Sequence, residues 1–406
     1  MYKFSLKIMF CIVFIAFIFS ISNAQSVVKT SPEQVSTPSP TLPPLTKPAD
    51  ADKKLSFYGD MRFRPELDRN VTTQDGSVLA DRERFRFRLR FGFNYQYSNV
   101  LSFGARIRTS IANDQQSPNV TAGANEFAVL PIGLDRAFIK YTAGSFMAWA
   151  GKNSFPFYTH DEMFISQDIS PEGLYGSYEY KVSDNFKLKP AAGYFIILSS
   201  GKTFDLDKTL KAFQLSGNYK SGKHELNAST GLFVLDSLGN TPDGTQTFTV
   251  NYHISYSNLK YTYSGFKIPL SVAGNFMLNT ETLDNKTIVV NNHQDQKTGY
   301  SATFEIGKLK VAKDFLVSVT YAHIEKYALL DYISQDDWMR WGETGAASGN
   351  RSSNFRGIEL RAGYAFGSNC NLLARAYFVN GIVKNTPTAA ALETGNRFRL
   401  DFNVGF

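Results

Sequence analysis

The stretch "RERFRFRLRFGFNYQYSN", residues 82–99, decides the fold class of this chain. Arginine occupies every second position from residue 84 to residue 90, and phenylalanine or leucine lies between the arginines. A period of two places successive side chains on opposite faces of a β-strand. One face of this strand therefore carries guanidinium groups and the other carries large apolar groups. Which of the two faces points out of the protein depends on the rest of the sequence.

The composition narrows the class of protein. The 406-residue chain contains 34 Phe and 21 Tyr and carries a net charge of +7. Its mean hydropathy of −0.23 is too low for a bundle of membrane helices. The basic excess is mild and unclustered, which argues against nucleic acid as a partner. The histidines show no metal-ligand spacing and no catalytic motif is present, so we predict no metal, no cofactor and no enzymatic activity.

The N-terminal residues have the features of an export signal. Two lysines precede an apolar run from residue 8 to residue 19, and Ser22-Asn23-Ala24 is a small-residue cleavage site. The run is shorter than the roughly 20 residues of a membrane-spanning helix, which favours a cleaved signal peptide over residues 1–24. Residues 25–54 are rich in Pro, Ser and Thr and predict a periplasmic tether. The remaining domain is residues 55–406.

From residue 55 onward, about sixteen segments alternate between apolar and polar residues, as the strands of membrane barrels do. The connections between them alternate between short and long. The short turns are predicted at 98–99, 143–144, 183–185, 221–222 and 368–369, and the long loops at 66–81, 111–133, 154–172, 280–297 and 326–353. Membrane barrels keep short turns at the periplasmic end and long loops outside. The predicted fold is therefore all-β: a transmembrane antiparallel β-barrel of about sixteen strands.

The last segment, "GNRFRLDFNVGF", residues 395–406, supports the same fold. Its apolar side chains alternate with polar ones and end on an aromatic residue. It resembles the C-terminal targeting signal of bacterial outer-membrane barrels, which implies the barrel-assembly machinery as a partner. The residues of this assembly signal are Phe398, Leu400, Phe402, Val404 and Phe406.

In a membrane barrel the apolar face of each strand contacts lipid, so the arginines point into the lumen. A charge facing lipid at the midplane would cost about 2–4 kcal/mol. The same parity argument applied to the neighbouring strands gives one contiguous surface across the barrel closure. We call this surface the arginine wall; it consists of Arg62, Arg64, Arg84, Arg86, Arg88, Arg90, Arg106, Arg108, Arg361, Arg375, Arg397 and Arg399. Only Asp60, Glu359 and Asp401 are expected as inward acids beside it, so we expect water and mobile anions, rather than dry packing, against it.

Residues 134–173, "LDRAFIKYTAGSFMAWAGKNSFPFYTHDEMFISQDISPEG", carry a family resemblance. The strand "DRAFIKY", a following strand that ends in Gly151-Lys152, and a loop closed by Pro171-Glu172-Gly173 resemble the putative porin family of Gram-negative outer membranes. That family is related to the phosphate-selective porins. The resemblance implies a channel with an aqueous lumen. It transfers no substrate, because the basic ladders of the anion-specific members do not align with this chain.

In general porins the third long loop folds into the lumen. If residues 154–172 do the same, the constriction-loop acids Asp161, Glu162 and Asp168 face the arginine wall; the alternative is a loop that stays on the rim. The sequence thus predicts an outer-membrane porin, in contact with lipid, for passive diffusion of small hydrophilic solutes. It would prefer anions, phosphate among the candidates, or be weakly selective, and act as a monomer or homo-oligomer. The alternative function is an occluded barrel that serves as a scaffold, an adhesin or a lipid-active enzyme.

Overall fold

The computed structural model describes most of the chain from residue 54 to residue 406. The described residues are 54–110, 116–124, 126, 129–238, 249–283, 288–338 and 353–406. The predicted signal peptide, and the predicted tether apart from Lys54, lie outside these residues and remain predictions. Within the described part, no helix combines the length and the apolar character needed to cross a membrane.

The described residues form one antiparallel β-sheet in which consecutive strands pair along the chain. Two short helices, η2 (Phe204–Leu206) and α2 (Ile288–Asn291), lie in connections. The strands are β1 (Leu55–Thr72), β2 (Arg82–Gln96), β3 (Leu101–Thr109), β4 (Val120–Thr121), β5 (Ile132–Ala143), β6 (Phe146–Lys152), β7 (Glu172–Tyr178), β8 (Tyr180–Lys181), β9 (Phe186–Leu198), β10 (Lys208–Ser221), β11 (His224–Leu235), β12 (Tyr252–Tyr263), β13 (Leu270–Asn279), β14 (Thr298–Gly307), β15 (Phe315–Ile324), β16 (Phe355–Gly367), β17 (Cys370–Gly381) and β18 (Thr394–Gly405).

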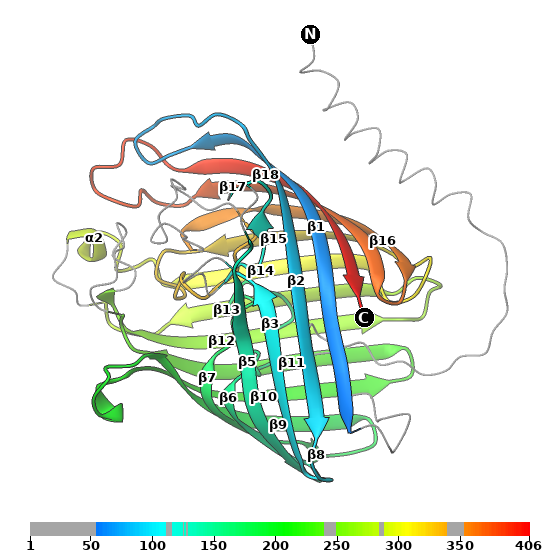
Figure 1. Ribbon diagram of the computed structural model, residues 1–406. Helices are drawn as coiled ribbons and strands as arrows, with labels where there is room; N and C mark the ends of the chain where they lie inside the picture. The colour runs from blue at the N-terminus through cyan, green and yellow to red at the C-terminus, as the bar shows by residue number, and fades with distance from the viewer. Residues whose placement is uncertain are drawn as a thin grey trace. The chain divides into compact units, whose positions relative to one another are not determined.

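The sheet closes on itself, because β1 pairs with β2 on one side and with β18 on the other (Figure 1). Met61 of β1 lies opposite Leu89 of β2 and opposite Val404 of β18. The segment β4 is a two-residue piece that pairs with β2, and β7 and β8 are consecutive pieces of one strand that pair with β9. The result is a closed barrel of sixteen strands, which confirms the predicted fold class.

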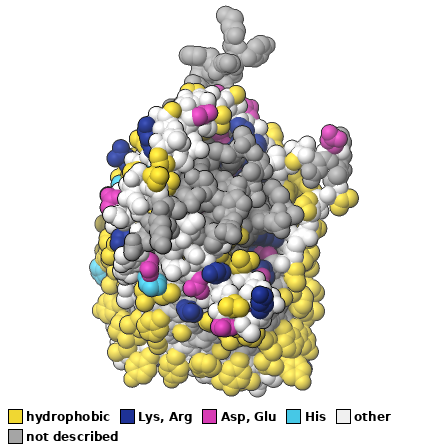
Figure 2. All heavy atoms as spheres, turned by 90° about the vertical axis from the view of Figure 1, so that its left-hand side faces the viewer, with side chains coloured by type: hydrophobic (Ala, Val, Ile, Leu, Met, Phe, Trp, Pro, Cys, Tyr) yellow, Lys and Arg dark blue, Asp and Glu magenta, His cyan; other side chains and the backbone are white. Residues whose placement is uncertain are grey.

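The outer surface of the strands is apolar. In β2, Phe85 is 70% exposed, whereas Arg88, on the opposite face, is 6% exposed. The same alternation exposes Phe57 and Phe63 of β1. In Figure 2 the hydrophobic side chains crowd the lower part of the outer surface. An apolar surface of this extent is typical of a protein that lies in lipid.

The two ends of the barrel differ. The tight turns lie at one end, as predicted; for example, β5 ends at Ala143 and β6 begins at Phe146. The long connections and α2 lie at the other end, on the left of Figure 1. Two of the predicted long loops, 66–81 and 111–133, differ from the structure. The first loop begins only after Thr72, because β1 continues seven residues beyond its predicted end at residue 65, and β4 interrupts the second loop.

A hydrophobic core lies inside the barrel. Phe157 and Phe164, which follow β6, pack with Phe233 of β11 and Tyr256 of β12 on the inner face. The rings of Phe164 and Tyr256 stack with their centroids 4.4 Å apart. Residues 327–330, which follow β15, are also buried in this core. The expectation of a water-filled lumen is therefore wrong for this side of the barrel, because two connections fold inward and supply apolar side chains.

Candidate functional site

The arginine wall lies on the inner face of six adjacent strands, β16, β17, β18, β1, β2 and β3. The inward side chains alternate with exposed apolar ones along each strand. The register places like charges directly opposite each other: Arg62 faces Arg88, and Arg375 faces both Arg361 and Arg399. Directly opposed like charges destabilise a sheet. Carboxylates must therefore lie between them.

Acidic residues of the same strands separate the arginines. The Nε atom of Arg64 donates to Asp401 at 2.5 Å, and both side chains are almost completely buried. Asp60 accepts from Arg88 at 2.5 Å and from Arg90 at 2.6 Å. The remaining inward carboxylates on these strands are Glu66, Asp68 and Glu359, which bind Arg84, Arg397 and Arg375 respectively.

This arrangement corrects the expectation of only three inward acids. Glu66 and Asp68 point inward because β1 continues through residues that the sequence assigned to a loop. Asp135 points inward because of a bulge: Arg106 pairs with Arg136 and the next pair is Ile107 with Leu134, so Asp135 is the extra residue. It accepts from the Nε atom of Arg106 at 3.0 Å. Dry packing of the arginine wall is possible because these acids neutralise it.

Loop 153–171, which joins β6 to β7, crosses the lumen. Its Tyr158 exchanges hydrogen bonds with Gln214 of β10 at 2.8 and 2.9 Å. Further along, Asp161 accepts from Asn275 of β13 at 2.7 Å. At the far end of the loop, Asp168 accepts from Arg90 of β2 at 2.9 Å.

The three predicted constriction-loop acids therefore lie in different places. Only Asp168 contacts the arginine wall directly, through Arg90. Asp161 faces the opposite side of the barrel, where Ser301 of β14 also donates to it at 3.3 Å. Glu162 lies between the two sides, beside Asp336 and Asp337.

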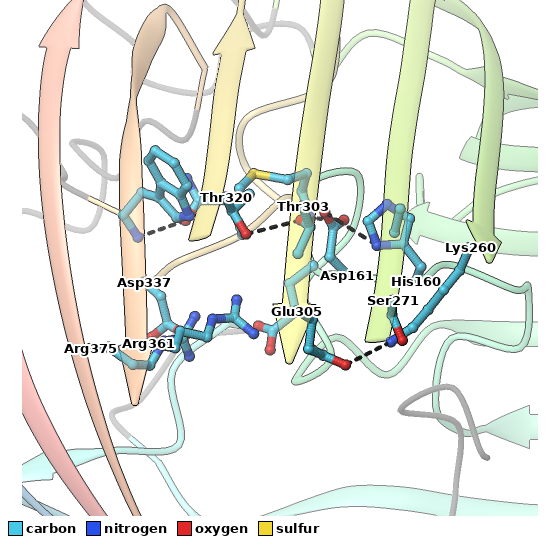
Figure 3. A pocket seen from close by; sticks show the side chains of 15 residues that line it. His160, Asp161, Lys260, Ser271, Thr303, Glu305, Thr320, Asp337, Arg361 and Arg375 are labelled. Atoms are coloured by element: carbon cyan, nitrogen blue, oxygen red, sulfur yellow. Dashed lines mark hydrogen bonds and ion pairs between the residues drawn. The ribbon is translucent and has the colours of Figure 1, made fainter. Parts of the chain in front are cut away.

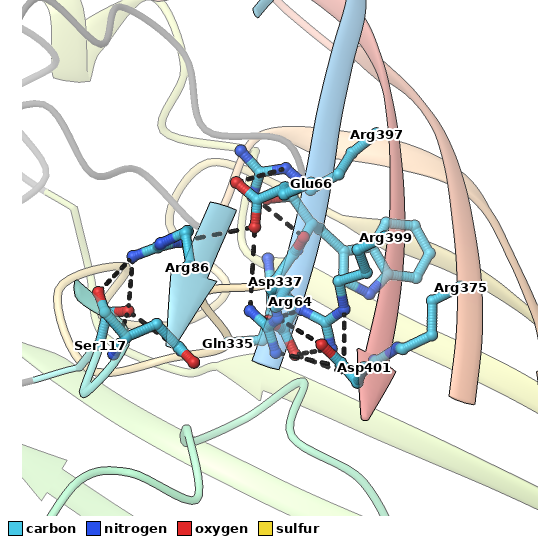
Figure 4. A network of polar contacts seen from close by, with 12 residues as sticks. Arg64, Glu66, Arg86, Ser117, Gln335, Asp337, Arg375, Arg397, Arg399 and Asp401 are labelled. Atoms are coloured by element: carbon cyan, nitrogen blue, oxygen red, sulfur yellow. Dashed lines mark hydrogen bonds and ion pairs between the residues drawn. The ribbon is translucent and has the colours of Figure 1, made fainter. Parts of the chain in front are cut away.

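A second inward segment, residues 325–338, was missed by the sequence reasoning. Asp337 accepts from Arg399 and from Arg375, the latter at 3.1 Å, and lies 3.6 Å from Arg64 (Figure 4). Trp338 packs against Phe355 with ring centroids 5.1 Å apart. The signal available in the sequence is the acidic-aromatic run "DDW" at residues 336–338, within the predicted long loop 326–353.

A small cavity lies between the two inward segments and the inner face of the barrel strands. Its volume is about 40 Å³, enough for a few water molecules. Figure 3 shows the side chains that line it from the loops and from the barrel strands. Its lining includes the ionisable side chains of His160, Glu162, Lys260, Glu305, Arg361 and Arg375.

The acidic residues of the two inward segments differ in the direction in which their pKa values are shifted. Burial acts to raise the pKa of Asp168, but Arg90 and Arg88 outweigh burial and hold that pKa below its ordinary value. For Asp337, burial is likewise outweighed, by Arg399 and Arg375, and its pKa lies well below the ordinary range. Burial, followed by repulsion from Asp337, raises the pKa of Glu162 to about 7.

Two inward arginines lack an acidic partner in the part of the chain that the structure describes. Among the described residues, Arg62 and Arg136 form no ion pair with a carboxylate. Arg62 donates instead to the side-chain amide oxygen of Asn403 at 2.7 Å. The Nε atom of Arg136 is buried without a hydrogen-bond partner. Arg136 was not in the predicted site; it lies on the inward parity of β5, next to the bulge at Asp135.

The predicted assembly-signal residues lie on the outer face of β18 and just beyond it. Phe406 exchanges backbone hydrogen bonds of 3.0 Å with Gly59 of β1. Its ring stacks on Phe91 of β2 at 6.4 Å between centroids. The role of these residues in assembly remains a prediction.

A closed sixteen-strand barrel with an apolar exterior and a charged interior defines a porin-like β-barrel. A family model described as "Putative porin" matches residues 71–236, which is less than half of the chain. The chain is structurally similar to OmpF of Salmonella typhi in complex with daunomycin, with a TM-score of 0.50 and 11% identity over 87% of this chain and 97% of that chain. It is also similar to OprB of Pseudomonas putida at high pH, with a TM-score of 0.52 and 13% identity over 87% and 95%. No curated protein matches the sequence.

Proposed function

We propose that the protein is an outer-membrane diffusion channel for small hydrophilic solutes, with a preference for anions. The fold supports a channel, because a barrel of sixteen strands is wide enough for an aqueous path. The observation that carries the anion preference is the surplus of positive charge on the inner wall. Arg62 and Arg136 point inward without an ion-pair partner among the described residues. The arginines that form ion pairs contribute less to the anion preference, because the paired carboxylates cancel most of their electric field.

The preference expected from this geometry is mild. Most members of the arginine wall hold the barrel closure and the inward segments in place. Among the described residues, Arg62 and Arg136 are the guanidinium groups left without a carboxylate to attract a mobile anion. Phosphate is one candidate among small anions, and the other residues of the wall give no reason to favour it over chloride.

One observation favours the second candidate, an occluded barrel with a role as scaffold, adhesin or lipid-active enzyme. Loop 153–171 and residues 325–338 place a packed apolar core inside the lumen. A conductance measurement on the purified protein in a planar bilayer separates the two candidates. A steady current with an anion-selective reversal potential in a salt gradient supports the channel. The absence of current supports occlusion, and a cation-selective current contradicts the anion preference.

A further inference from the structure

The two inward segments touch each other inside the barrel. The backbone N–H of Ser166 in loop 153–171 donates to the carbonyl oxygen of Ile333 at 3.0 Å. The same two segments also meet through acidic side chains: carboxylate oxygens of Glu162 in the loop and of Asp336 and Asp337 in the second segment lie within 4.8 Å of one another. Three carboxylates at this separation repel strongly unless protons or cations neutralise them. The contact between the segments is therefore sensitive to the charge of this group.

Asp337 and Glu162 differ in their partners. Arginines from two strands, Arg375 and Arg399, donate to Asp337 and keep it ionised. Within the described part of the chain, Glu162 takes part in no hydrogen bond or ion pair. Of these two groups, Glu162 is therefore the one whose charge can change, and Asp337 is the one that anchors the second segment to the barrel.

We propose that Glu162 and Asp337 form a proton-controlled latch between the two inward segments: a proton on Glu162 lets the segments meet across the lumen, and its loss drives them apart. This inference rests on the proposed function, because a latch controls passage only in a conducting barrel.

The charged groups around Glu162 come from both segments and from four strands. Asp336 and Asp337 face it from the second segment, and His160, Asp161 and Asp168 belong to its own loop. The groups on the strands are Lys260, Glu305, Arg361 and Arg375.

The cations among these groups are already engaged with other acids. Lys260 lies 3.2 Å from Glu305. Arg361 donates to Glu359 at 2.7 Å, and Arg375 binds both Glu359 and Asp337. No cation is therefore committed to Glu162 among the described residues. A proton is better suited than a divalent cation to neutralise the group of Glu162, Asp336 and Asp337, because the arginines beside Asp337 would repel a metal ion.

The direction in which pH shifts the latch follows from the difference in the pKa of Glu162 between the latched and the unlatched state. In the latched state its pKa is about 7, compared with an ordinary value of 4.5 when it is exposed. The latched state therefore binds more protons between these two pH values. As the pH rises through this window, the free energy that favours the latch falls, and above about pH 7 it stays constant. The ratio of unlatched to latched channels therefore increases as the pH rises through the window.

The first test is the conductance of the full-length protein in planar bilayers between pH 5 and pH 8. We expect the wild-type conductance to rise with pH and the Glu162→Gln variant to stay at the low-pH level throughout. Glu172→Gln is the matched control, because Glu172 is exposed at the start of β7 and pairs with Lys152; it should behave as the wild type. A wild-type conductance that does not change with pH, or a step that persists in Glu162→Gln, overturns the latch.

The second test does not require a current. In a Trp149→Phe, Trp341→Phe background, the fluorescence of Trp338 reports on the segment that Asp337 anchors. We expect its emission maximum to shift between pH 5 and pH 8, and the shift to be lost in Glu162→Gln. An absent shift overturns the latch, whereas a shift without any current contradicts only the channel function.

Discussion

Asp68 of β1 accepts a hydrogen bond from the Nε atom of Arg397 of β18 at 2.8 Å, and this contact joins the first and the last strand of the barrel. Both side chains are buried. Arg397 also donates to the carbonyl oxygen of Asp337 at 3.2 Å. The barrel closure and the inward segment that contains Asp337 therefore share one network of charges.

The first prediction concerns this closure. Asp68→Asn removes a charged partner of three arginines, Arg397, Arg82 and Arg84. Removing one member of a buried ion pair costs about 3–5 kcal/mol. We expect the barrel to lose its compact, fast migration in an SDS gel at a clearly lower temperature than the wild type. Asp81→Asn is the control, because Asp81 is exposed; it should change stability by less than about 0.5 kcal/mol. Equal unfolding temperatures for the two variants would contradict the prediction.

The second prediction concerns the packing of the C-terminal residue. A Cβ atom at Gly59 would lie 2.5 Å from the ring of Phe406 and 2.5 Å from the carbonyl oxygen of Arg90. Gly59→Ala therefore forces the ring or the strand to move, at a cost of about 1–3 kcal/mol. We expect a lower yield of folded barrel, measured by heat-dependent gel mobility. Gly133→Ala should fold normally, because no heavy atom within 4 Å would meet its new Cβ. An unchanged yield for Gly59→Ala would show that Phe406 is not fixed there.

The sequence predicts the barrel well because alternation is a local property. In β2, the alternation places the arginines on one face and the apolar side chains on the other. Once the whole chain is identified as a membrane barrel, the apolar face must meet lipid. The strands β16, β17 and β18 are adjacent because consecutive strands pair, and β18 lies beside β1 because the barrel closes. The length of β1 was underestimated, because Pro65 and the charged residues after it are typical of loops.

The interior was harder to predict, because it depends on contacts between residues far apart in the chain. Asp135 lies at a bulge, and a single extra residue leaves no signal in a period-two pattern. Asp337 contacts Arg399, which is separated from it by the whole of β16 and β17. The alternation shows which side chains point inward, but it does not show which loops enter the lumen to meet them.

The third prediction tests the surplus charge. Arg62→Gln together with Arg136→Gln removes the two inward arginines that have no acidic partner among the described residues. We expect the reversal potential in a salt gradient to shift toward cations, with little change in unfolding temperature, because no ion pair is broken. Lys202→Gln, in the exposed connection after β9, is the control and should keep the wild-type selectivity. Selectivity that survives the double substitution would place its origin elsewhere.

The fourth prediction concerns the anchor of the second inward segment. Asp337→Asn retains the shape of the side chain but weakens its bonds to Arg399 and Arg375, since charge-assisted hydrogen bonds are roughly twice as strong as neutral ones. The segment should then leave the arginine wall for part of the time. We expect a higher and noisier single-channel conductance than in the wild type at the same pH. Asp205→Asn, in the exposed helix η2, should leave the conductance unchanged. A quiet channel of wild-type conductance in Asp337→Asn would show that this segment does not obstruct the path.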